Sequence, residues 1–161
     1  MSDASRITDI RLDERSIVRW SPEIEHERDV AIFDLLEDNH FQVRSDLQGP
    51  FELLLSLRET TLIMDVTGAA NDNGTRQHVE IALSVRPLRR IIKDYFMICE
   101  SYFDAIKGAT PSRIEAIDMA RRGLHNEGSD VLKDALVDKV GLDDNTARRL
   151  FTLVCVLHLR G

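Results

Sequence analysis

The sequence predicts an α+β protein in which an N-terminal strand and helix precede an antiparallel β-meander, and three packed helices form the C-terminal half. Residues 77–85 alternate polar and apolar side chains, as in a half-buried strand. Apolar residues recur at helical spacing over residues 88–106, and residues 150–159 are apolar nearly all round. The 161-residue chain is 43% hydrophobic, which is enough for one core, so we expect residues 1–161 to form a single domain.

The N-terminal elements are one strand and one helix. Residues 6–12 alternate polar and apolar side chains and predict the strand. Ser21, Pro22 and Glu23 then indicate a helix start, because Ser is a good N-cap, Pro suits the first helical position, and an acid suits the first turn. We expect this helix to run to about Asn39, with a heavily acidic outer face.

Three strands are expected in the middle of the chain. Residues 51–57 and 61–66 are typical strand segments, and the short polar link between them predicts a hairpin. Residues 71–74, Asn-Asp-Asn-Gly, form a strong turn signal before the strand at 77–85. These strands are expected to form an antiparallel meander with one face toward the core.

Three helices are expected after the meander. The first begins at Pro87 and is closed by Gly108, and the second begins at Thr110-Pro111. The third begins at Asp143 or Asp144, and its apolar character predicts a central, buried position.

Two glycines interrupt the second of these helices, at Gly123 and Gly128. Each costs about 1 kcal/mol relative to Ala in a helix interior. We therefore expect either a break in the helix or the close approach of another backbone.

Composition and charge restrict the classes of function. The net charge is −7, and it is uneven: residues 1–84 hold 8 Lys/Arg against 17 Asp/Glu, whereas residues 85–161 hold 13 against 11. This acidity argues against nucleic-acid binding, which needs a basic face. A small basic cluster at Arg86, Arg89, Arg90 and Lys93 is best explained as a solvated helix face, with RNA association as the alternative.

The cysteines and the N-terminus predict a cytoplasmic protein. Cys99 and Cys155 lie in apolar helical segments and form neither a disulfide framework nor a metal motif. The N-terminus has no apolar stretch typical of a signal peptide, and residues 150–159 are too few to span a bilayer. We expect no metal, no cofactor and no membrane contact, and a two-fold homodimer is compatible with the sequence.

A polar cluster in the last two predicted helices is the candidate site. Arginines offer forked donors to phosphate or carboxylate, and glycines permit close approach of a ligand. The candidate ligand-binding residues are Arg121, Arg122, His125, Asn126, Glu127, Ser129, Arg148 and Arg149. The competing interpretation is structural: the cluster fixes a helix–helix junction, with Arg148 and Arg149 paired to Glu115, Asp118 or Glu127.

Long stretches of the chain resemble a known family. Residues 92–102, 114–129 and 146–157, together with Glu25-His-Glu-Arg, resemble the uncharacterised family UPF0262 of alphaproteobacteria. The resemblance covers almost the whole chain and implies a bacterial, cytosolic protein. It implies no activity and no catalytic residues.

Two hypotheses for function follow from the cluster. The first is a non-enzymatic protein that binds a small anion or a protein partner through the arginines. The alternative is a hydrolase or transferase acting on a phosphorylated small molecule, with His125 as the general acid or base and Glu127 or Asp118 orienting it. The sequence leaves open whether the protein is an enzyme.

Overall fold

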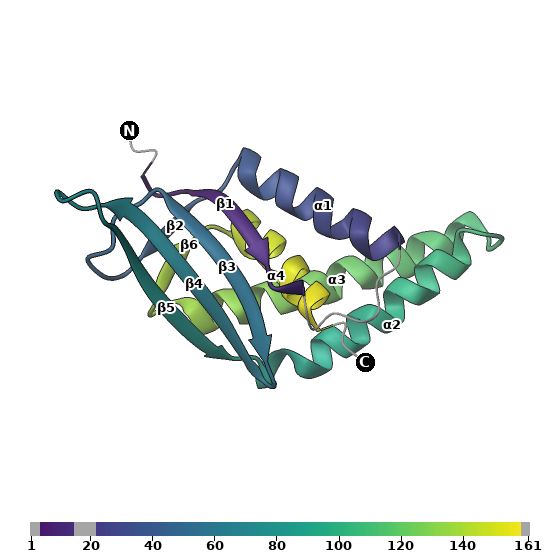
Figure 1. Ribbon diagram of the computed structural model, residues 1–161. Helices are drawn as coiled ribbons and strands as arrows, with labels where there is room; N and C mark the ends of the chain where they lie inside the picture. The colour runs from purple at the N-terminus through teal and green to yellow at the C-terminus, as the bar shows by residue number, and fades with distance from the viewer. Residues whose placement is uncertain (1–3, 15–21, 159–161) are drawn as a thin grey trace.

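The computed structural model describes residues 4–14 and 22–158. Figure 1 shows the sheet and the helices, coloured from the N-terminus to the C-terminus. The elements are β1 (Ile7–Leu12), α1 (Pro22–Glu37), β2 (Phe41–Val43), β3 (Phe51–Arg58), β4 (Thr61–Ala70), β5 (Arg76–Ser84), the 3₁₀ turn η2 (Arg86–Leu88), α2 (Arg89–Ala105), α3 (Pro111–Leu136), β6 (Val140–Leu142) and α4 (Asp144–Leu157). Within these residues, every helix and every strand of the predicted meander is confirmed. Ser21, the predicted N-cap of α1, lies outside the described residues.

The main sheet has four strands in the order β1-β3-β4-β5. β3, β4 and β5 pair antiparallel, which confirms the meander, and β1 joins β3 in parallel at one edge. Two turns contain a residue with positive φ: Gly74 has a φ of 80° in the predicted turn, where glycine is favoured. Glu59 has a φ of 56° in the hairpin between β3 and β4, a conformation that is uncommon for residues other than glycine.

A second, two-stranded sheet was not predicted from the sequence. β2 pairs antiparallel with β6, with Phe41 opposite Leu142 and Val43 opposite Val140. Each strand has three residues, too few for a recognisable alternation. The pair brings the segment after α1 next to the start of α4, so it helps to position both helices.

Helix α4 lies at the centre of the molecule, between the sheet and the other helices (Figure 1). It packs against α1, α3 and β3. Leu150 and Val154 of α4 meet Leu55 and Met64 of the sheet, while Phe151 is fully buried toward α3. The prediction of a central, buried last helix is therefore confirmed for its described residues.

Helix α3 continues without interruption through both glycines. Thr110 caps it by accepting a hydrogen bond from the Arg113 amide at 3.3 Å. Neither a break nor an approaching backbone explains Gly128. A Cβ there would lie 2.1 Å from Cζ of Phe151, so the glycine makes room for an aromatic ring; Gly123 has nothing within 4 Å.

The glycine pair gives a test of this packing. We expect Gly128→Ala to lower the free energy of unfolding by up to about 2 kcal/mol, because overpacking costs about 1–3 kcal/mol and the gain in helix propensity offsets about 1 kcal/mol of it. Gly123→Ala, on the same helix with open space around it, should raise the free energy of unfolding by up to about 1 kcal/mol. Chemical denaturation measures both, and equal stabilisation by the two variants would contradict the contact with Phe151.

Candidate functional site

A hollow of about 420 Å³ opens between α1, α3 and α4, with Tyr95 of α2 at its wall. Helices α3 and α4 contribute Arg121, Arg122, Arg148 and Arg149 to it. Helix α1 forms the facing wall. We call this hollow the arginine groove. The sequence placed these arginines in two helices, and the fold brings all four to one concavity.

The two α3 arginines share one carboxylate. The carboxylate of Asp118 forms an ion pair with each guanidinium, with N–O distances of 2.5 Å to Arg121 and 2.9 Å to Arg122. Arg121 also lies over the Tyr102 ring, 4.8 Å from its centroid, in a cation–π contact. These bonds hold the α3 arginines in place and neutralise part of their charge, and they lower the pKa of Asp118.

The two α4 arginines have no such carboxylate. Arg148 donates to the side-chain oxygen of Asn126, and Arg149 makes one long bond, 3.5 Å, to the backbone oxygen of Asp38. Among the described residues, no carboxylate lies within 4.0 Å of either guanidinium. The predicted pairing of Arg148 and Arg149 with Glu115, Asp118 or Glu127 is therefore wrong: Asp118 is bound by the α3 arginines, and neither Glu115 nor Glu127 lines the groove.

The start of α4 is firmly anchored, so its arginines have fixed positions. Asp143 caps the helix by accepting the Thr146 amide at 2.9 Å. The buried hydroxyl of Thr146 accepts a bond of 3.0 Å from the amide of His40, in the segment after α1. These contacts join the first turn of α4 to the end of α1.

His125 lies at the bottom of the groove in a packed setting. Its ring meets Tyr95 and Phe151 edge to face, with centroids 5.5 and 5.2 Å away. Its Nε2 shares a hydrogen bond of 2.8 Å with the hydroxyl of Thr152, and its Nδ1 lies 3.5 Å from that of Ser129. Hydroxyl groups of α3 and α4 thus face both ring nitrogens.

Burial and the positive charges of Arg148 and Arg121 lower the pKa of His125 to about 4. The imidazole is therefore neutral at neutral pH. A base with a pKa this low accepts a proton weakly at pH 7, so the groove does not favour general-base catalysis by His125.

The α1 wall carries the opposite charge. Glu27 and Asp34 both line the groove, two helical turns apart. Tyr95 is buried, and its hydroxyl donates to Glu27 across 3.4 Å. Sequence reasoning missed Glu27 as a site residue because it assigned the acids of α1 to a solvated face.

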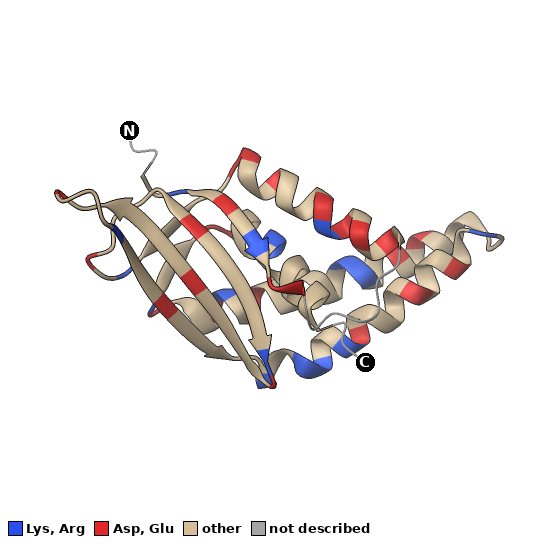
Figure 2. Ribbon diagram, in the orientation of Figure 1, with Lys and Arg blue, Asp and Glu red and all other residues tan. Residues whose placement is uncertain are grey.

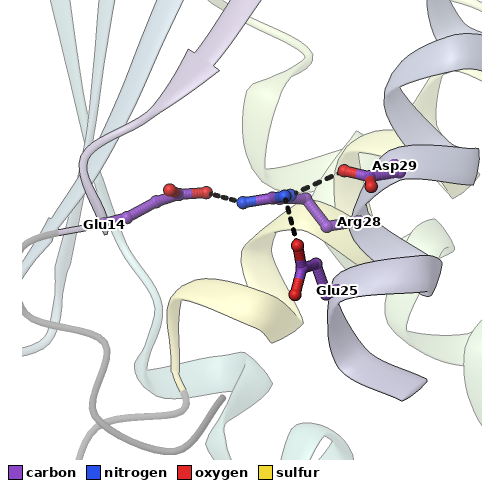
Figure 3. A network of polar contacts seen from close by, with 4 residues as sticks. All are labelled: Glu14, Glu25, Arg28 and Asp29. Atoms are coloured by element: carbon purple, nitrogen blue, oxygen red, sulfur yellow. Dashed lines mark hydrogen bonds and ion pairs between the residues drawn. The ribbon is translucent and has the colours of Figure 1, made fainter. Parts of the chain in front are cut away.

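Arg28 fixes the position of this wall. Its guanidinium contacts Glu14, just beyond β1, as well as Asp29 at 2.9 Å and Glu25 at 3.8 Å (Figure 3). These ion pairs tie the first turns of α1 to the end of β1. Figure 2 shows how densely acidic residues follow one another along α1.

Three of the predicted site residues do not line the groove. Glu127 is exposed on α3 and faces elsewhere, and Asn126 acts only through its bond to Arg148. Ser129 is buried and donates to the backbone oxygen of His125 at 2.7 Å, a helix-internal contact. The groove therefore contains Arg121, Arg122, His125, Arg148 and Arg149 of the predicted set.

The other candidate features contribute less. Asp94, Ser101 and Asp104 lie on one face of α2, where they border a second hollow of about 430 Å³ with Met97 and Leu124. Within the described residues, no group of three or more His, Cys, Asp or Glu is arranged to hold a metal ion. No helix in that part of the chain combines the length and apolar character needed to cross a membrane.

The fold and groove define an α+β protein with a central buried helix and an arginine-lined concavity between helices. The chain belongs to the family described as "Uncharacterised protein family (UPF0262)", which matches residues 4–160. A UPF0262 protein of Rhodospirillum rubrum is 58% identical over 161 residues, covering 100% of this chain and 97% of that protein. UPF0262 proteins of Mesorhizobium japonicum and Brucella anthropi are 60% and 58% identical over 158 residues, covering 98% of this chain and 95% and 96% of theirs.

These matches confirm the resemblance predicted from the sequence, and the relatives are bacterial proteins. No solved structure matches the chain significantly. None of these three relatives' names states an activity.

The state of His125 is directly testable. Its folded-state pKa of about 4 lies below the usual value of 6.5, so between these two pH values the unfolded chain binds a proton that the folded chain does not. The free energy of unfolding should therefore fall as the pH drops from 6.5 toward 4, and more steeply in the wild type than in His125→Gln. An NMR titration of the imidazole measures the pKa, and a midpoint near 6.5 would contradict the packed, neutral ring.

Proposed function

We propose that the protein binds a small anion in the arginine groove and performs no chemistry on it. The observation that supports the proposal is the pair Arg148 and Arg149, which line a concave surface without a carboxylate partner among the described residues. A guanidinium group without a carboxylate partner, held on a fixed helix, can bind a phosphate or carboxylate group, because each of these accepts two parallel hydrogen bonds.

The charge distribution supports the same proposal. The chain has a net charge of −7, yet the groove gathers four arginines against the two carboxylates of Glu27 and Asp34. Because the arginines outnumber the carboxylates, the concavity has a net positive charge, and an anion would be drawn to this part of an otherwise acidic protein.

The binding role is favoured over an enzymatic one by the state of His125. The burial and positive charge that lower its pKa to about 4 leave it a weak base, and its ring nitrogens face the hydroxyls of Thr152 and Ser129. A neutral imidazole of this kind contributes a hydrogen bond and shape to the groove.

We also infer a cytoplasmic location, because Cys99 and Cys155 are both buried as free thiols.

Binding is tested with inorganic phosphate, pyrophosphate and citrate, by calorimetry at constant ionic strength. We expect at least one of these probes to bind saturably, and Arg148→Gln/Arg149→Gln to weaken that binding tenfold or more. A hydrogen bond to a charged group contributes about 1.5–3 kcal/mol, and 1.4 kcal/mol corresponds to a factor of ten.

Arg113→Gln is the matched control, because Arg113 is an exposed arginine at the start of α3 and does not line the groove. It should leave the affinity unchanged. The absence of saturable binding by all three probes would refute the proposal, as would equal losses in the control and in the double variant. Thermal unfolding of each variant checks that its fold is intact.

A further inference from the structure

The arginine groove has two walls of opposite charge, and they do not neutralise each other. Arg148 and Arg149 lie on α4, while Glu27 and Asp34 lie on α1. Among the described residues, no ion pair within 4.0 Å joins either arginine to either carboxylate. A molecule placed in the groove therefore meets an unpaired cationic side and an unpaired anionic side.

Glu27, in the wall formed by α1, has few hydrogen-bond partners. A carboxylate offers about four acceptor sites. In the described part of the chain, the side chain of Glu27 receives a single long hydrogen bond, 3.4 Å, from the Tyr95 hydroxyl. Arg121 is close enough to act on it electrostatically, but its guanidinium is bound to Asp118 and lies over Tyr102.

Partial burial of Glu27 makes the lack of hydrogen-bond donors unfavourable for its charged carboxylate. The side chain is only partly exposed, and burial raises its pKa against the opposing effects of Arg121 and Tyr95. A desolvated carboxylate is stabilised by any donor that reaches it, and most by a cation. Asp34, on the same wall, likewise has no side-chain ion pair among the described residues.

We propose that the ligand is dipolar: Arg148 and Arg149 bind its anionic group, and Glu27 binds an amine at its other end. This inference rests on the proposed function and specifies the class of ligand. A simple dianion would satisfy the α4 wall and leave the carboxylates of α1 facing further negative charge. A molecule with both groups satisfies both walls.

The test compares phosphonates that differ only in the amine. Aminomethyl-, 2-aminoethyl- and 3-aminopropylphosphonate are each paired with the alkylphosphonate in which a methyl group replaces the ammonium group: ethyl-, propyl- and butylphosphonate. Calorimetry at constant ionic strength measures all six dissociation constants for the wild-type protein. We expect at least one aminoalkylphosphonate to bind tenfold or more tightly than its alkyl partner. Three chain lengths are used so that one can match the span of the groove.

Variants assign the preference to Glu27. Glu27→Gln keeps the size of the side chain and removes its charge, so it should abolish the preference for the amine while changing the affinity for the alkylphosphonate less than twofold. Glu23→Gln removes the same charge from an exposed position of α1 that does not line the groove, and it should leave the preference intact.

The outcomes separate this inference from the proposed function. If the phosphonates bind through Arg148 and Arg149 but no amine improves the affinity, the dipolar ligand is wrong and the anion site stands. If the preference survives Glu27→Gln and disappears in Asp34→Asn, the assignment to Glu27 is overturned. If no phosphonate binds, the dipolar ligand is wrong, and the anion site is judged separately by the binding of phosphate, pyrophosphate and citrate. The comparison of probes on the wild type is decisive even if Glu27→Gln does not fold.

Discussion

Burial of helix α4 is the constraint on which the other features of this protein depend. Its side chains from Leu153 to Leu157 are all buried, so the helix must be enclosed by the sheet on one side and by α1 and α3 on the others. Burying a Leu, Val or Phe side chain contributes about 1.5–3 kcal/mol. Apart from its first residues, the helix meets solvent along one side, where Arg148, Arg149 and Thr152 are partly exposed and line the groove.

The groove follows from this enclosure. Phe151 reaches α3 where Gly128 leaves space, and the same contact places His125 against the ring. Since α1 packs on the opposite side of α4, its acidic residues Glu27 and Asp34 face the arginines across an open space. The packing of apolar side chains thus decides which charges face one another.

Charge pairing within α3 explains why the groove stays cationic. Asp118 binds both Arg121 and Arg122, as expected for residues three and four positions apart on one helix. This local pairing occupies Asp118, and Glu127 does not line the groove, so neither pairs with the α4 arginines. If Arg148 and Arg149 bind a ligand as proposed, the cluster combines both interpretations, because the hydrogen bond between His125 and Thr152 joins α3 to α4.

The sequence by itself determined the helices, the strands of the main sheet and the four arginines of the groove. Apolar periodicity, the Asn-Asp-Asn-Gly turn and the cap of α4 are local signals, and local contacts of the backbone enforce them. Only the tertiary structure decided the pairing of β2 with β6 and the place of Glu27 and Tyr95 in the groove. Those features join segments far apart in the chain, and they depend on the burial of α4. The spacing of residues within one helix does not show which other helix will face it.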